Sequence, residues 1–326
     1  MMISLWHFIT AVLLTVLLLA CNRSNEPLKI SLCQDGTIAP LLLLAQEKGY
    51  YGIEGLEISF HPMGDGKLAM DAFLDGKCDA AVIAEPAIVE RLFKTQDFVI
   101  IATVGSSDNA SRIVADRRSG IKTAKDLKGK KTAVRKGEIS HFFLDMFLAK
   151  NDIRPEQVTI KFLEPQQLSE ALITRQIDAY AASDIYLAEG VRRLGDNAVV
   201  LSEPGLCRNS SSMLLKKSDL KARPNIAASL LKALLKAEKR AAEAPEELVS
   251  LVAKRREISV ESARSIITEQ NLVVSLPQQM LPGMDDYAVW MKEQGLAPSG
   301  RYQGVTGIIE DTALKNLSPA AVTIKH

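Results

Sequence analysis

The run RKGEISH at residues 135–141 has the residue types that a small ligand could use. It separates a short apolar segment typical of a strand from an amphipathic segment with helical spacing. Several backbone N–H groups at the start of such a helix have no partner, and the helix dipole favours an electron-rich ligand there. Gly137, Glu138, Ser140 and His141 are therefore candidate ligand-contacting residues, although an ordinary solvated turn accounts for the same pattern.

Acidic residues recur at the predicted strand ends of this chain: Asp35, Glu85, Glu138 and Asp184. Each of them alone is explained as a turn or helix-cap residue. Together they favour a ligand with amino or heteroaromatic N–H groups, whereas the helix starts favour an anion. The residues alone leave both ligand classes open.

Catalytic motifs find little support in the sequence. It contains no G-x-S-x-G elbow, no H-E-x-x-H and no glycine-rich phosphate loop. His61 and His141 fall near predicted strand and helix ends, where a pair of histidines could serve acid–base chemistry. Hydrogen-bonded structural roles explain them more simply, so we expect a protein that is not an enzyme and has no metal site or cofactor.

The elements that position these residues occur twice. Residues 29–83 and 131–182 each read as strand, helix, strand, helix, strand. In each unit an Asp-Ala pair opens the third strand, at Asp79-Ala80 and again at Asp178-Ala179. This order predicts parallel strands with right-handed crossovers, arranged in two similar α/β lobes.

Two apolar segments at 98–114 and 198–215, each interrupted by a polar stretch, are predicted to cross between the lobes. We therefore assign residues 28–110 plus 213–326 to lobe I and residues 111–212 to lobe II. Within them we expect strands at 29–32, 56–60, 79–83, 98–104, 112–114, 131–134, 158–162, 178–182, 198–201 and 212–215. We expect helices at 38–48, 67–74, 140–150, 168–174, 225–243, 245–255, 260–271 and 278–293.

Ligands of open α/β sheets bind outside the carboxyl ends of the strands. In lobe I these ends are the predicted loops 33–37, 62–66 and 84–86. In lobe II they are 135–140, 164–167 and 182–186. If the lobes face each other across two crossings, these loops line one cleft that closes like a hinge.

The first twenty residues contain no Asp, Glu, Lys or Arg, and their apolar run has the length of a signal-peptide core. The following Leu-Leu-Ala-Cys resembles the lipobox of bacterial lipoproteins. We expect a signal peptide at 1–20, a lipidated Cys21 and a tether at 21–27. An uncleaved anchor is the alternative, and either places the rest of the chain in the cell envelope at a bacterial membrane surface.

The composition fits one large or two ordinary globular domains, with 326 residues, 47% hydrophobic content and a formal net charge of +1. Near-neutral charge gives no reason to expect nucleic acid as a partner. Cys33, Cys78 and Cys207 match no zinc pattern and are interpreted as small buried residues, with one optional disulfide that the spacing does not assign.

A family resemblance extends over residues 28–237. IAPLLLLAQEKGYYGIEGLEISFHPMGDG, the ordered set SGIKTAKDLKGK with the turn and helix after it, and ALITRQIDAYAASDIYLAEG carry it. They resemble the substrate-binding proteins for alkanesulfonates, taurine and nitrate and for thiamine-pyrimidine precursors. The resemblance implies a type II periplasmic-binding-protein fold, monomeric, that hands a small organic solute to an ABC permease. Its ligand contacts would fall on Gln34, Asp35, Glu85, Ser111, Gly137, Ser140, His141 and Asp184.

Two departures from the family pattern matter. Glu138 stands where small Gly, Ser or Thr residues are usual, which argues against a sulfonate or nitrate ligand. The related eukaryotic pyrimidine synthase has a His after the third strand and a Cys-rich run near the second crossing. Here residues 84–91 have no His and residues 206–212 have only Cys207, so that chemistry is not expected. The alternatives are a sensor or partner-binding module on the same fold, and an enzyme using His61 and His141.

Overall fold

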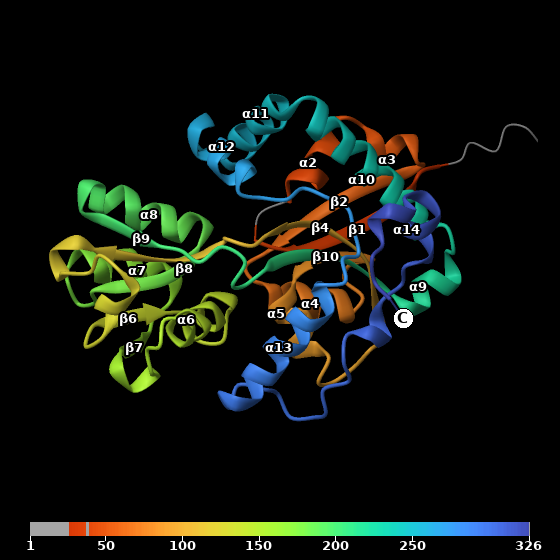
Figure 1. The fold of residues 1–326 in the computed structure, drawn as a ribbon. Coiled ribbons are helices and arrows are strands. Elements are labelled where there is room, and N and C mark those ends of the chain that lie inside the picture. The colour runs from red at the N-terminus through yellow and green to blue at the C-terminus, as the bar shows by residue number, and fades with distance from the viewer. Residues whose placement is uncertain (1–25, 37–38, 326) are drawn as a thin grey trace, which may run out of the picture.

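The computed structural model describes residues 26–36 and 39–325. Two five-stranded sheets flanked by helices lie next to each other and are joined by two chain segments that run together between them (Figure 1). We call the sheet nearer the N-terminus and its helices lobe I, and the other sheet and its helices lobe II. The predicted leader and Cys21 lie outside the described residues.

The sheet of lobe I has the strand order β2-β1-β3-β10-β4. The first three strands are mutually parallel, and β10 is antiparallel to both of its neighbours. The strands are β1 (Leu28–Asp35), β2 (Leu56–Met63), β3 (Ala80–Ala84), β4 (Phe98–Ser107) and β10 (Asn209–Lys216).

The sheet of lobe II repeats this plan with the order β7-β6-β8-β5-β9. Its strands are β5 (Ser111–Asp116), β6 (Lys131–Val134), β7 (Thr159–Phe162), β8 (Ala179–Ser183) and β9 (Ala198–Leu201). In each sheet the fourth position is taken by the strand that arrives from the other lobe, β10 in one and β5 in the other. The two predicted crossings are therefore built into both sheets, and each ties one lobe to the core of the other.

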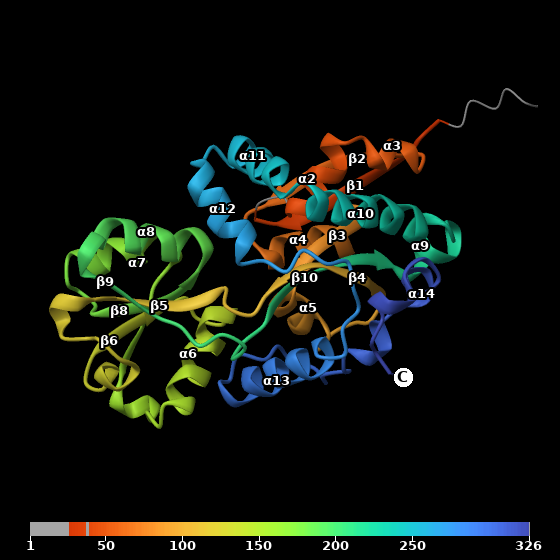
Figure 2. The same cartoon turned by 45° about the horizontal axis from the view of Figure 1, so that its top comes forward.

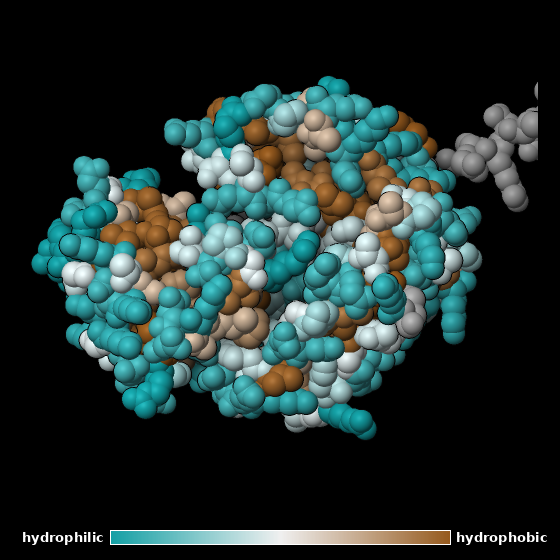
Figure 3. All heavy atoms as spheres, in the orientation of Figure 1, coloured by the Kyte–Doolittle hydropathy of each residue, from teal (hydrophilic) through white to brown (hydrophobic). Residues whose placement is uncertain are grey.

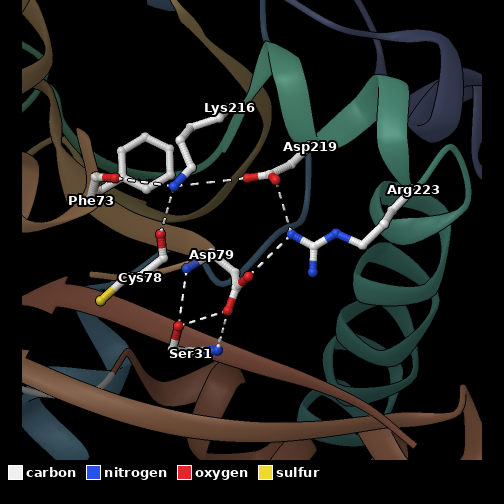
Figure 4. A network of polar contacts seen from close by, with 7 residues as sticks. All are labelled: Ser31, Phe73, Cys78, Asp79, Lys216, Asp219 and Arg223. Carbon is white, nitrogen blue, oxygen red and sulfur yellow. Dashed lines mark hydrogen bonds and ion pairs between the residues drawn. The ribbon is translucent and has the colours of Figure 1, made fainter. Parts of the chain in front are cut away.

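The repeated Asp-Ala pairs have the same structural task in both lobes. The Asp79 carboxylate accepts the backbone N–H of Ser31 on β1 at 2.9 Å, and the Asp178 carboxylate accepts that of Lys131 on β6 at 2.8 Å. Each carboxylate thus supplies a partner to a strand N–H where the sheet pairing begins. In lobe I the same carboxylate also binds Arg223 at 3.1 Å, which anchors the C-terminal region to the sheet (Figure 4).

Helices cover both faces of each sheet (Figure 2). In lobe I, α2, α10 and α11 pack together on one side, while α4, α5 and α13 pack together on the other. The helices are α2 (Pro40–Glu47), α3 (Tyr50–Ile53), α4 (Gly66–Leu74), α5 (Glu85–Arg91), α6 (Ile139–Lys150), α7 (Pro165–Ile173), α8 (Asp184–Leu194), α9 (Lys217–Ala222), α10 (Ile226–Glu243), α11 (Pro245–Arg256), α12 (Val260–Thr268), α13 (Met280–Glu293) and α14 (Thr312–Leu317).

These elements confirm the fold predicted from the repeat, with local corrections. The loop predicted at 33–37 is wrong for its first three residues, because β1 pairs with β2 as far as Asp35. The loops predicted at 84–86 and 182–186 are also wrong in part, because α5 and α8 begin there. The return to the first sheet comes at Asn209, where β10 starts, a few residues before the predicted boundary at 213.

The optional disulfide joins Cys33 at the end of β1 to Cys78 just before β3, while Cys207 is free and buried. The Cα atoms of Cys33 and Cys78 are 5.7 Å apart, within the usual range for a disulfide. Among the described helices none combines the length and the apolar character needed to cross a bilayer.

Candidate functional site

A cleft of about 950 Å³ lies between the lobes. Lobe I contributes the ends of β1 and β3 and the crossing strands β4 and β10. Lobe II contributes α8, and the region of α11 and α12 forms the remaining wall. The surface is indented on the side where α8 and α12 face each other (Figure 3). Small-molecule sites commonly measure about 300–1,000 Å³, so the cleft is large enough for an organic solute.

Gln34 lines this cleft and is 1% exposed, yet its side-chain oxygen and nitrogen both lack a hydrogen-bond partner among the described residues. A buried polar group left without partners costs about 1–3 kcal/mol, so such groups are rare unless they serve a purpose. β1 places this side chain at the carboxyl end of the parallel strands, where ligands of this class of sheet bind. A solute in the cleft could supply the missing partners.

Asp35 follows Gln34 and also lines the cleft. One of its carboxylate oxygens accepts the Ala84 N–H at 2.6 Å, which holds the side chain between the ends of β1 and β3. Burial raises the pKa of Asp35 to about 6, and the Ala84 N–H opposes that rise. The Asp35 carboxylate thus links the ends of β1 and β3 and also faces the cleft.

Further polar groups in the lining were not predicted from the sequence. Ser106 and Ser107 end β4, Asn209 and Ser211 begin β10, and Arg112 lies on β5. The side-chain oxygen of Asn209 is buried and has no hydrogen-bond partner in the part of the chain that the structure describes. The sequence showed only that the two crossings are polar, and their pairing side by side turns that polarity into one wall of the cleft.

Ser111 and Glu85 lie close to the crossings but outside the lining. The Ser111 and Ser183 hydroxyls are 2.9 Å apart, which joins β5 to the end of β8. Glu85, at the start of α5, is buried and accepts a hydrogen bond from the Ser210 hydroxyl. Burial raises the pKa of Glu85 to about 7, opposed by the Ser210 hydroxyl and the nearby Arg208. The Arg208 guanidinium in turn donates to Ser106 at 2.6 Å, so Glu85 is connected indirectly to the cleft wall.

The turn before α6, with Gly137, and the first turn of α6, with Ser140 and His141, also lie outside the lining. The Gly137 N–H donates to His141 Nδ1 at 3.2 Å, and the Tyr287 hydroxyl donates to the Gly137 carbonyl at 2.6 Å. Ser140 is buried. His141 packs edge-on against Trp290 at 5.0 Å, and burial lowers its pKa. Helix α13, about 150 residues further along the chain, thus uses the surface that was predicted to bind ligand.

Glu138 forms ion pairs within its own turn. Its carboxylate accepts from Arg135, and the same guanidinium lies 3.3 Å from Glu164. Burial raises the pKa of Glu138, and the Arg135 charge opposes this. These contacts explain the charge of the turn without a ligand.

The remaining predicted site residues are placed as follows. The Asp184 side chain and Cys21 lie outside what the structure describes. His61 is exposed on the edge strand β2. Among the described residues no cluster of His, Cys, Asp or Glu has the arrangement of a metal site.

Comparison with known proteins places the chain in a family. The family model described as NMT1/THI5 like matches residues 37–248. A curated binding protein of Brucella abortus, provisionally named, is 28% identical over 166 residues, which is 51% of this chain and 50% of that protein. The chain therefore spans about half the length of the curated relatives it matches.

Two solved structures share the fold at low identity. The periplasmic aliphatic sulphonate-binding protein SsuA of Escherichia coli has a TM-score of 0.76 at 18% identity, covering 87% of this chain and 92% of its own. The desulfurization enzyme DSZB has a TM-score of 0.67 at 13% identity, covering 89% and 98%. The fold thus occurs in both a binding protein and an enzyme. The family match covers about two thirds of the sequence, so this chain belongs to the NMT1/THI5-like family.

Proposed function

We propose that this protein is an extracytoplasmic solute-binding protein that captures a small organic molecule in the cleft between its lobes and delivers it to an ABC permease. The observation that carries the proposal is the buried Gln34 amide, which has no hydrogen-bond partner among the described residues and faces a cleft of about 950 Å³. The family membership and the shared fold with SsuA agree with it. A lipidated Cys21 would keep the protein beside its permease, and one copy would suffice for binding.

Closure of the lobes on the solute is part of the proposal. The crossings run together, with the Gly205 N–H donating to the Asp108 carbonyl at 3.0 Å and Asn209 paired with Ser107. Two short antiparallel connections that lie side by side permit rotation of one lobe against the other if the contact of α13 with α6 shifts as the lobes move. The disulfide between Cys33 and Cys78 fits an oxidising compartment outside the cytoplasm.

Retention of a solute by the purified protein tests the binding role. The full-length chain, purified without denaturation and measured by native mass spectrometry, should retain a small molecule. Ala188 is exposed on α8 and lines the cleft, so Ala188→Trp should abolish retention without unfolding the protein. Ala242→Trp, at an exposed position of α10 outside the lining, is the matched control. Retention that is equal in both variants would place binding elsewhere.

The delivery role needs a separate measurement, because a sensor on the same fold would bind solute equally well. Cells lacking this protein should lose ATP-dependent uptake of the retained solute, and the Ala188→Trp variant should not restore it. Normal uptake without the protein would favour the sensor or partner-binding alternative.

The enzyme alternative receives one supporting fact, the fold shared with DSZB. Neither of the two histidines that this alternative needs for acid–base chemistry faces the cleft. His141 is enclosed by Gly137, Phe162 and Trp290, and His61 is exposed on the edge strand β2 outside the cleft lining. Unchanged mass of the solute after prolonged incubation would speak against turnover.

A further inference from the structure

The arginines that line the cleft already contact protein groups, although the Arg112 Nε is buried with no hydrogen-bond partner among the described residues and can donate to an acceptor of the solute. The Arg112 guanidinium binds Glu269 at 2.7 Å, and Arg192 binds both carboxylate oxygens of Glu189 at 2.8 and 3.0 Å. The third described arginine of the lining, Arg256, is not free either. An anionic solute would therefore compete with Glu269 and Glu189 for these guanidinium groups.

The start of α2 at the cleft has one N–H donor fewer than an ordinary helix start. Helix α2 begins at Pro40, which lines the cleft and has no backbone N–H. Helix starts bind anions mainly through such N–H groups. Pro40 favours the helical backbone conformation at the start of α2, but it supplies no N–H donor to the cleft.

A negative charge is present at the site without a cation to balance it. Asp35 has no ion-pair partner among the described residues, and the charge of another acid, Asp65, contributes to raising its pKa. An anion at this position would meet repulsion, whereas an N–H group would find a good acceptor. The neighbouring Gln34 amide offers one acceptor and two donors side by side.

The rest of the lining is suited to an apolar body. Val82, Val104, Leu187, Val191, Val200, Ile258 and Ile266 contribute aliphatic groups to it. We infer that the cleft takes an uncharged organic solute that presents N–H donors beside a carbonyl or ring-nitrogen acceptor, as carboxamides and lactams do, and that it rejects sulfonates and carboxylates. This inference rests on the proposed binding function and names the chemical class of its ligand.

Matched pairs of probes test the class. Nicotinamide and nicotinate differ only in an amide against a carboxylate, and benzamide, benzoate and benzenesulfonate extend the comparison. With the full-length protein we expect the amides to raise the midpoint of thermal unfolding, because a ligand that binds the folded state stabilises it. The anions should leave the midpoint unchanged.

Substitution of Asp35 tests whether its carboxylate contacts the amide. Asp35→Asn should weaken amide binding about tenfold to a hundredfold, the usual worth of a hydrogen bond to a charged group. Asp75→Asn, at an exposed position at the end of α4, should leave binding unchanged. Unaltered amide affinity in Asp35→Asn, with a normal unfolding midpoint, would remove Asp35 from the site and overturn the assignment.

Failure of the class and failure of the binding role give different results. Anion binding that Ala188→Trp abolishes would refute the class and leave the binding role intact. A further outcome is that the purified protein binds no probe and still retains a solute. Identification of that solute as a sulfonate or a carboxylate would also refute the proposed ligand class. If no probe binds and nothing is retained, the proposed function itself fails.

Discussion

Replacing Gln34 by leucine should change ligand binding and folding stability in opposite directions. The two side chains have similar volume, so the core around β1 is not opened. In the ligand-free protein the substitution removes a 1% exposed amide that has no partner among the described residues. Relief of that penalty should stabilise the fold by about 1–3 kcal/mol. The same change removes the donors and acceptor offered to the solute, and retention should be lost.

Thermal and urea unfolding of solute-free protein measure the first effect, and native mass spectrometry measures the second. For a chain of this size a gain of 1 kcal/mol corresponds to a rise of about 1.5–2 °C in the midpoint. Gln46→Leu, at an exposed position on α2, controls for the general effect of added hydrophobicity. A lower midpoint for Gln34→Leu than for wild type would show that the amide has a structural partner, and the argument for the site would fail.

Three further predictions concern stability. Because burial raises the pKa of Glu85 to about 7, the stability that Glu85 contributes should be lost as pH rises from about 4.5 to above 7, and Glu85→Gln should be more stable than wild type at pH 8 by up to about 3 kcal/mol. An unchanged pH dependence in urea unfolding would contradict this. Mutation of Cys33 and Cys78 to alanine removes a disulfide with a sequence separation of 45 and should cost about 2–4 kcal/mol in urea unfolding, whereas no loss would mean that the bond does not form. Trp290→Phe removes the donor to Asp145, at 2.8 Å between α13 and α6, and should cost about 1–3 kcal/mol; equal stability would mean that this contact does not hold the lobes together.

The repeat of strands and helices was enough to predict the fold. The spacing of apolar residues within each segment indicates the order of strands and helices. Asp79 and Asp178, each followed by alanine, occupy equivalent positions before the third strand of each lobe. The placement of Gln34 and Asp35 beside the cleft also follows from local order, because the carboxyl end of β1 is near the sheet centre. Residues of this kind can be found from the sequence.

The remainder of the site depends on contacts between distant segments. The start of α6 carries the expected donors, but His141 uses one of them and α13 covers the turn through Tyr287. Nothing in the local sequence of α13 or α12 indicates which lobe surface each helix contacts. For the same reason Arg112 was not predicted to line the cleft, since its position depends on the pairing of β5 and its ion pair with Glu269.

A crystal structure of the protein with its retained solute tests the central claim most directly. The account predicts density for the solute between the lobes, with polar atoms within hydrogen-bonding distance of the Gln34 amide and the Asp35 carboxylate. Density for the solute away from Gln34, for example beside Glu138 at the start of α6, would contradict it.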